Sequence, residues 1–226
     1  MLSWKYRLAA APYRALDALG LMPPPAAPAV YVVERMNWST KWDGTYLAQE
    51  IEKFAPGTLK ITERPEQYVR TLVHFGSQFQ WCVWAEALPA SNRYVVTYFH
   101  GKPEDGPDMA HHVEEFIRLL PKAELVVTAA SITERRLLNW GVPRHKLVRI
   151  PIGVDCNLFR PVCPDARAAA RARYGIKPDH LVIGSFQKDG VGWGDGSEPK
   201  LIKGPDVLLD VIGRVAKERP AFVLLT

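Results

Sequence analysis

The chain has 226 residues, of which 47% are hydrophobic and 23% charged, as in an ordinary soluble globular protein. Its 29 Lys and Arg against 24 Asp and Glu give a net charge of +5, a small excess that is spread along the chain and suits anionic ligands. We therefore expect no nucleic-acid partner, which would need a concentrated basic stripe, and no membrane-spanning segment, because no apolar run is long enough.

The N-terminal residues 1–21 have the composition of a basic helix with aromatic residues. Lys5, Arg7 and Arg14 interrupt the apolar core that an export signal needs. Such a helix could associate weakly with an anionic membrane surface, although docking on its own domain or fraying is favoured because its apolar residues are scattered. The proline-rich residues 22–28 predict an extended spacer after it.

The cysteines are few and irregularly spaced. Cys82, Cys156 and Cys163 form no pattern that would bind zinc, so we expect no metal site. A bridge between Cys156 and Cys163 is geometrically conceivable, but free thiols are favoured, which indicates a reducing, cytoplasmic location.

Apolar runs alternate with segments of helical spacing along the chain. The pattern predicts strands at 30–34, 59–62, 71–75, 93–99, 125–129 and 180–186, and helices at 45–54, 108–120, 132–140 and 205–217. The alternation predicts an α/β fold built on a doubly wound parallel sheet.

Three segments carry a resemblance to a known family. Residues 148–161 comprise a strand, a Pro/Gly turn with Ile152-Gly153-Val154-Asp155 and a linker, while residues 124–131 precede it and residues 203–209 follow it. In order and spacing these segments resemble family-4 glycosyltransferases, which are retaining GT-B enzymes. Ile152 stands where the family usually has Asn. The resemblance implies a GT-B-like fold with one Rossmann-like N-terminal domain and the first strand-helix-strand unit of a second.

We accordingly predict four parts. Residues 1–29 are the N-terminal helix and spacer, 30–160 the acceptor-side domain, 161–179 the linker and 180–226 part of the donor-binding domain. The apolar residues 221–226 predict a buried parallel strand that needs a further neighbour and a following helix. We expect the chain to be truncated before the family's donor-binding glutamates, so that this fragment alone is inactive.

The resemblance also implies an activity. It implies hexosyltransferase-like transfer of a sugar from a nucleotide-sugar donor to a glycan, lipid or small-molecule acceptor, with retention and with no metal or cofactor. In such enzymes the departing phosphate itself helps to deprotonate the acceptor. Two alternatives stay open: a non-catalytic GT-B-like protein that binds a sugar nucleotide or glycan, and a nicotinamide oxidoreductase. The second fits the sheet, but no convincing glycine-rich fingerprint follows the first strand.

The donor diphosphate is expected to bind in the second domain. Lys203-Gly204 matches the family's Lys-Gly before a helix, where a cation and a helix N-terminus stabilise the leaving group. The family usually has an Arg after the preceding strand's glycine, where this chain has Ser185. Either Lys188 or Lys200 supplies that charge, or the pair of charges is incomplete.

In the first domain, Asp43 and Gly44 are expected in a loop that opens a helix, where the family has a double glycine. Asp43 is predicted either as the N-cap of that helix or, with Gly44, as a substrate contact.

Four histidines lie on or next to the predicted strands and helices. His100 follows a strand and matches the family's His that faces the donor sugar, so it is the predicted catalytic residue. His74 lies on a strand and is a candidate substrate contact, although a structural role is favoured. His111 and His112 are expected on a solvated helix face.

Overall fold

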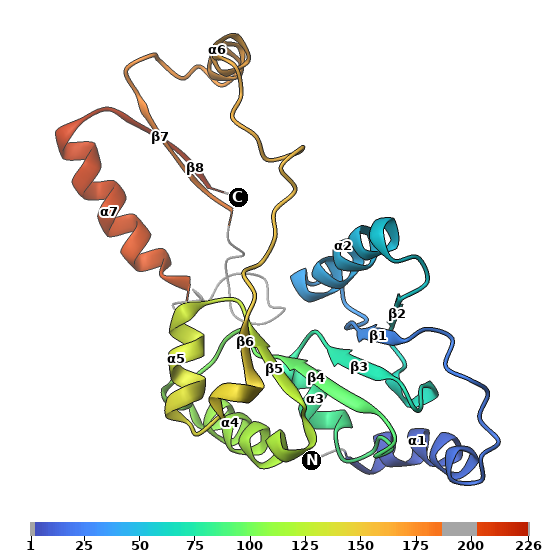
Figure 1. Cartoon of the computed structure of the whole chain (residues 1–226). Coiled ribbons are helices and arrows are strands. Elements are labelled where there is room, and N and C mark those ends of the chain that lie inside the picture. The colour runs from blue at the N-terminus through green and yellow to red at the C-terminus, as the bar shows by residue number, and fades with distance from the viewer. Residues whose placement is uncertain (1–2, 187–202, 226) are drawn as a thin grey trace. The chain divides into compact units, whose positions relative to one another are not determined.

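The structure is a computed structural model that describes residues 3–186 and 203–225 (Figure 1). The chain divides into two compact units, Met1–Gly153 and Val154–Thr226, which we call unit 1 and unit 2. Lys188 and Lys200 lie outside the described residues.

Unit 1 is built on a six-stranded sheet whose strands are all parallel. They are β1 (Ala29–Val32), β2 (Leu59–Thr62), β3 (Leu72–Phe75), β4 (Arg93–Thr97), β5 (Leu125–Thr128) and β6 (Leu147–Arg149). Their order in the sheet is β2-β1-β3-β4-β5-β6. The short strands are rich in Val, as expected where helices cover a parallel sheet. The predicted α/β fold with a parallel sheet is confirmed.

The helices of unit 1 precede and connect these strands. They are α1 (Ser3–Ala18), α2 (Ser39–Phe54), α3 (Gln78–Trp84), α4 (Pro107–Leu119) and α5 (Ser131–Asn139), with 3₁₀ turns η1 (Pro65–Gln67), η2 (Pro103–Asp105), η3 (Leu120–Lys122) and η4 (Arg144–Lys146). Helix α3 contacts both α1 and α4, and α2 packs on β2. The core between the sheet and these helices includes fully buried aromatic side chains: Phe75, Trp81, Tyr98 and Phe116.

Helix α2 corrects one sequence expectation. It begins at Ser39, six residues before the predicted start at Thr45, so Asp43 and Gly44 lie inside the helix and not in a loop. Its N-cap is Trp38, which makes no side-chain capping bond, so the N-cap role predicted for Asp43 is wrong. The Thr45 hydroxyl donates to the Lys41 carbonyl at 2.8 Å, four residues back, as a helical hydroxyl does.

Helix α1 is docked on unit 1, the arrangement favoured from the sequence. Ala10 is fully buried, and the rings of Tyr6 and Trp84 meet edge to face with centroids 4.6 Å apart. Asp17 pairs with Arg70 at 3.2 Å. Among the described residues no helix combines the length and the apolar character that crossing a bilayer requires.

Unit 2 consists, in its described part, of α6 (Pro164–Arg173), β7 (Leu181–Ser185), α7 (Pro205–Glu218) and β8 (Ala221–Leu225). Strands β7 and β8 pair in parallel, with Leu181 opposite Ala221, and α7 packs on β8. This is the strand-helix-strand arrangement expected at the start of a Rossmann-like domain.

Candidate functional site

The carboxyl edge of the unit 1 sheet is the place where a parallel α/β sheet binds its ligands. The neighbouring strands β1, β3 and β4 lead there into residues 33–34, 76–78 and 98–100. Glu34, the residue that sequence reasoning passed over after β1, is only 5% exposed. Glutamate side chains are seldom buried in proteins, so a buried carboxyl at the end of β1 marks this edge of the sheet as polar.

A partly buried polar network lies just below this edge. The Nε2 atom of His74 lies 2.9 Å from the hydroxyl oxygen of Thr97 on the adjacent strand. The ring of Tyr31 meets that of His74 edge to face, with centroids 4.7 Å apart. Burial and the charge of Asp43 raise the pKa of Tyr31, and a hydrogen bond with Thr97 lowers it. The net effect is a pKa of about 12. Tyr31 therefore stays protonated at neutral pH.

His74 is held as a neutral imidazole. Burial lowers its pKa to about 4, because the surroundings disfavour the charged form. His74 lies on β3, where it pairs with Tyr31 of β1 and Val95 of β4. This position inside the sheet is consistent with the structural role that the sequence favours. Substrate binding by His74 stays a prediction.

Two glycines enclose the ring of Tyr31. A Cβ atom on Gly44 would lie 2.7 Å from the Tyr31 ring, and one on Gly76 would lie 2.5 Å from it. Gly44 therefore lets α2 approach β1 closely, which gives this residue a packing role independent of any ligand. Asp43, beside it, is partly exposed and has a pKa raised by burial.

His100 lies at the same edge, three residues after β4, with an exposed side chain. Its backbone is fixed by Gln78, a fully buried residue that sequence reasoning missed. The Nε2 atom of Gln78 donates to the His100 carbonyl at 2.9 Å, and its Oε1 atom accepts from the Phe99 N–H at 3.3 Å. Ser77 caps α3 by accepting from the Phe79 N–H at 3.3 Å, and a Ser before an apolar run was the signal available in the sequence.

An aromatic cluster surrounds His100. The ring of Phe79 packs against both His100 and His112, with centroid distances of 5.8 Å and 4.4 Å. His112 is partly buried, and burial together with the charges of His100 and His111 lowers its pKa to about 4. The expected solvated position is therefore wrong for His112, whereas His111 is exposed.

The predicted phosphate site of unit 2 lies at the start of α7. Gly204 is the N-cap in a left-handed conformation with φ 68°, which glycine adopts readily, and Pro205 takes the first helical position. Lys203 precedes it and is exposed. Free backbone N–H groups at a helix N-terminus and an adjacent cation favour an anion such as a phosphate.

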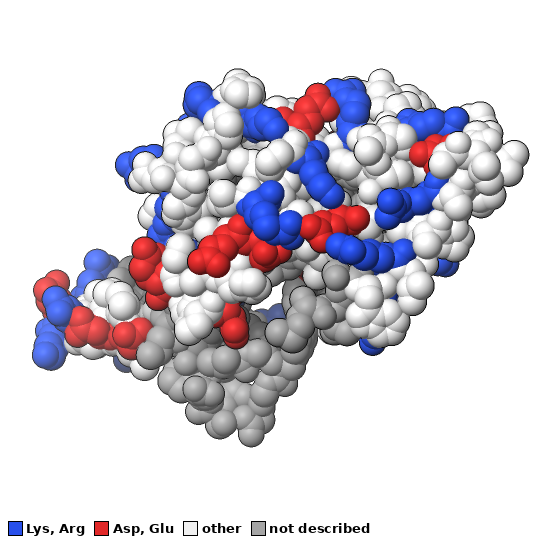
Figure 2. Space-filling model, turned by 90° about the horizontal axis from the view of Figure 1, so that it is seen from below, with Lys and Arg blue, Asp and Glu red and all other residues white. Residues whose placement is uncertain are grey.

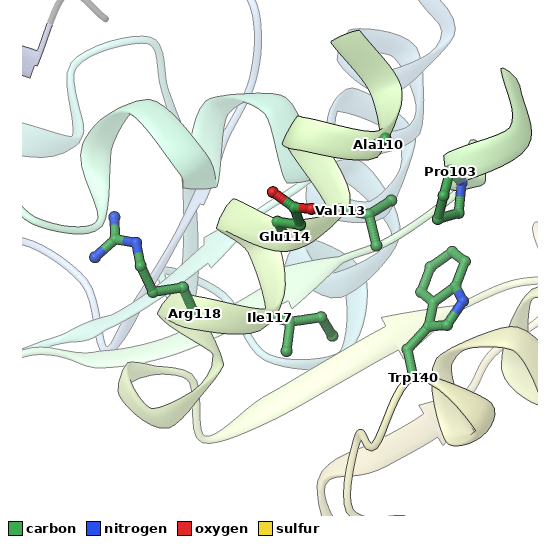
Figure 3. A pocket seen from close by; sticks show the side chains of 7 residues that line it. All are labelled: Pro103, Ala110, Val113, Glu114, Ile117, Arg118 and Trp140. Atoms are coloured by element: carbon green, nitrogen blue, oxygen red, sulfur yellow. The ribbon is translucent and has the colours of Figure 1, made fainter. Parts of the chain in front are cut away.

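A shallow hollow lies elsewhere on unit 1. It has a volume of about 520 Å³ and lies between α4 and the end of α5 (Figure 3), lined by Pro103, Ala110, Val113, Glu114, Ile117, Arg118 and Trp140. The predicted site residues within the described part of the chain do not line it. Among the described residues, no cluster of three or more His, Cys, Asp or Glu side chains could hold a metal ion.

Comparison with known proteins gives two sequence relatives. A D-inositol 3-phosphate glycosyltransferase of Streptomyces avermitilis is 29% identical over 120 residues, which are 51% of this chain and 23% of the relative. A protein of the same name from Segniliparus rotundus is 25% identical over 194 residues, which are 79% of this chain and 39% of the relative. The chain thus spans well under half the length of these curated relatives. No family model matches it.

The fold matches solved structures of one protein in particular. Anabaena Alr3699/HepE in complex with UDP and glucose superposes with a TM-score of 0.62 at 13% identity, over 88% of this chain and 60% of that protein. The same protein in complex with UDP-glucose superposes with a TM-score of 0.60. The chain therefore has a GT-B-like α/β fold.

Proposed function

We propose that the protein is a glycosyltransferase that transfers a sugar, most simply a hexose, from a nucleotide-sugar donor to an acceptor with retention of configuration. The observation that carries the proposal is the agreement of two comparisons. The sequence relatives bear the name of a glycosyltransferase, and the fold matches a protein crystallised with UDP-glucose. The acceptor is a glycan, a lipid or a small molecule.

In this proposal unit 2 binds the donor diphosphate through Lys203 and the N-terminus of α7. When the bond between sugar and diphosphate breaks, negative charge builds on the leaving group. The Lys203 ammonium is exposed beside a helix N-terminus capped by Gly204, so both positive features are available to the phosphate oxygens. Preorganised charges of this kind lower the barrier because they need no reorganisation during the reaction.

His100 is the residue of unit 1 proposed to act at the transferred sugar. It lies at the ligand-binding edge of the sheet, and the bonds from Gln78 fix the backbone on either side of it. The imidazole hydrogen-bonds a sugar hydroxyl or phosphate oxygen, while the departing phosphate takes the acceptor proton. No protein base is needed in that mechanism.

A second candidate function is non-catalytic binding of a sugar nucleotide or glycan. Ser185 favours this function. It follows Gly184 at the end of β7, where the family that this chain resembles has Arg. A hydroxyl supplies no charge to a diphosphate, so the donor site would have one cation fewer than such enzymes have.

The test compares Lys203→Ala and His100→Ala in the full-length protein, with UDP-glucose as the probe donor. Lys203→Ala is expected to lower kcat/KM by roughly 10² to 10³ and to weaken UDP binding measured by calorimetry. His100→Ala is expected to impair transfer but to change UDP affinity little. Lys217→Ala, at the other end of α7, is the matched control and should behave as wild type.

The outcomes separate the two functions. Wild-type protein that binds UDP-glucose with no transfer or hydrolysis of it would favour the binding protein. Unchanged turnover and UDP affinity in Lys203→Ala would contradict the phosphate site and leave Gly204-Pro205 as a purely structural helix start.

A further inference from the structure

Helix α1 turns its less apolar side toward the protein. The residues that face unit 1 recur with helical spacing and are buried or partly buried: Tyr6, Ala10, Tyr13 and Asp17. Ion pairs of 2.8 Å between Arg7 and Glu86 and of 3.2 Å between Asp17 and Arg70 hold the helix in this orientation. The helix is therefore an integral part of unit 1 and presents one defined face to solvent.

The opposite face is apolar and exposed. Its large side chains are Trp4 at 57% and Leu8 at 64% exposure, with Leu19 at 70% and Leu21 at 66% just after the helix. Positions 4, 8, 11, 15 and 19 share this face because they are three or four residues apart, and 11 and 15 are both Ala. Scattered exposed apolar residues are ordinary, whereas a row of them along one helix marks an interaction surface.

Basic residues flank this row. Lys5 and Arg14 are both exposed, and the Lys5 ammonium lies 5.7 Å from the Trp4 ring centroid. The acidic residue of the helix, Asp17, is turned inward and its side chain is only 12% exposed. Figure 2 shows the molecule from below, where Lys and Arg side chains lie among Asp and Glu side chains and uncharged areas.

We propose that the outer face of α1, formed by Trp4, Lys5, Leu8 and Arg14 and continued by Leu19 just after the helix, docks on an anionic lipid surface. A tryptophan with leucines on one face and cations at its borders suits the boundary between headgroups and acyl chains, where the rings and aliphatic side chains are buried and the cations reach phosphate. The surface charge selects lipid as the occupant, because a purely apolar protein partner would leave Lys5 and Arg14 without anions.

The position of α1 gives this contact a specific role. Asp17 touches Arg70 and Ser91, which come just before β3 and β4, so α1 lies at the amino ends of the strands. His100 and Gln78 lie at their carboxyl ends. Binding through α1 therefore anchors unit 1 with its ligand-binding edge away from the bilayer. This role does not depend on the proposed transferase activity.

Vesicle sedimentation tests the proposal with the full-length protein. Vesicles of phosphatidylcholine mixed with phosphatidylglycerol should bind it roughly 30-fold more tightly than phosphatidylcholine alone, for two cations at the surface. Raising the salt concentration should reduce this preference. Leu8→Glu/Leu19→Glu should abolish binding, and Lys5→Glu/Arg14→Glu should abolish the preference for anionic vesicles.

Phe54→Glu is the matched control, because Phe54 is 85% exposed on α2, and it should bind as wild type. Thermal unfolding of each variant checks that α1 remains docked. Equal sedimentation of wild type and Leu8→Glu/Leu19→Glu would overturn the proposal. The proposal would also be overturned if wild type bound no vesicles and the variant lost self-association. That result would assign the face to a second copy of the chain. Sugar transfer to a soluble acceptor should be unchanged in Leu8→Glu/Leu19→Glu, so failure of either proposal is distinguishable from failure of the other.

Discussion

The side chain of Gln78 holds the backbone of His100, because its Nε2 atom donates to the His100 carbonyl at 2.9 Å. The same amide accepts from the Phe99 N–H at 3.3 Å. Gln78 is the first residue of α3 and is fully buried. One side chain thus links the start of α3 to the segment after β4, so the placement of His100 depends on a residue outside its own strand.

Replacing Gln78 by Leu is expected to lower the free energy of unfolding by about 1–3 kcal/mol, because partly buried backbone groups at Phe99 and His100 lose their partners. Chemical denaturation measures this change. Gln80→Leu, at a partly buried position of the same helix, should be close to neutral. A Gln78→Leu protein as stable as wild type would show that water replaces both bonds.

Acid should destabilise unit 1 through its partly buried histidines. The pKa of His74 is about 4 in the folded protein against 6.5 for a free imidazole. Between these values the unfolded chain binds a proton that the folded chain does not, so stability is full above pH 6.5 and falls as the pH drops toward 4. His112, with a pKa of about 4, acts in the same direction.

The check is thermal unfolding above pH 6.5 and at about pH 5, where carboxylates still contribute little. His74→Gln keeps a hydrogen-bonding group near Thr97 but does not titrate, so its melting temperature should fall less than that of wild type between the two pH values. His145→Gln, at an exposed position, should leave the pH dependence unchanged. An identical fall in all three proteins would contradict the assignment to His74.

Adding a methyl group at Gly76 should crowd Tyr31. The new Cβ atom would lie 2.5 Å from the ring and 2.7 Å from its hydroxyl oxygen. Overpacking of this kind costs about 1–3 kcal/mol, so Gly76→Ala should unfold at lower denaturant concentration. Gly153→Ala, where a Cβ would meet nothing within 4 Å, should be neutral. Equal stability of both variants would show that Tyr31 moves aside freely.

The sequence predicted the parallel sheet well, because buried strands rich in β-branched residues alternate with long helical segments. It missed α3, whose seven residues, Gln78–Trp84, are too few to show helical periodicity. It also placed the start of α2 too late, because Asp43-Gly44 has the look of a turn. The glycine is there for close packing on Tyr31, which depends on tertiary structure.

The candidate site was predictable only in part. The position of His100 after a strand and the helix start at Gly204-Pro205 follow from local residue order. The roles of Tyr31 and Gln78 do not, because they arise where β1, β3 and β4 become neighbours. Pairing of β1 with β3, some 40 residues later in the chain, brings Gly76 against Tyr31. No spacing in the sequence encodes that contact.

The segment that follows unit 1 should be the first place where a protease cuts. Residues 150–170 are all exposed, and α6 contains no buried residue, so little packing energy opposes local opening there. Trypsin can cleave after Arg167, Arg171 and Arg173. Limited proteolysis followed by mass spectrometry should find early cuts between Pro161 and Tyr174 and a stable N-terminal piece. The core of unit 1 offers the internal comparison, because its strands and α4 bury their apolar side chains. Early cuts concentrated in residues 70–130 would contradict the independent packing of unit 1.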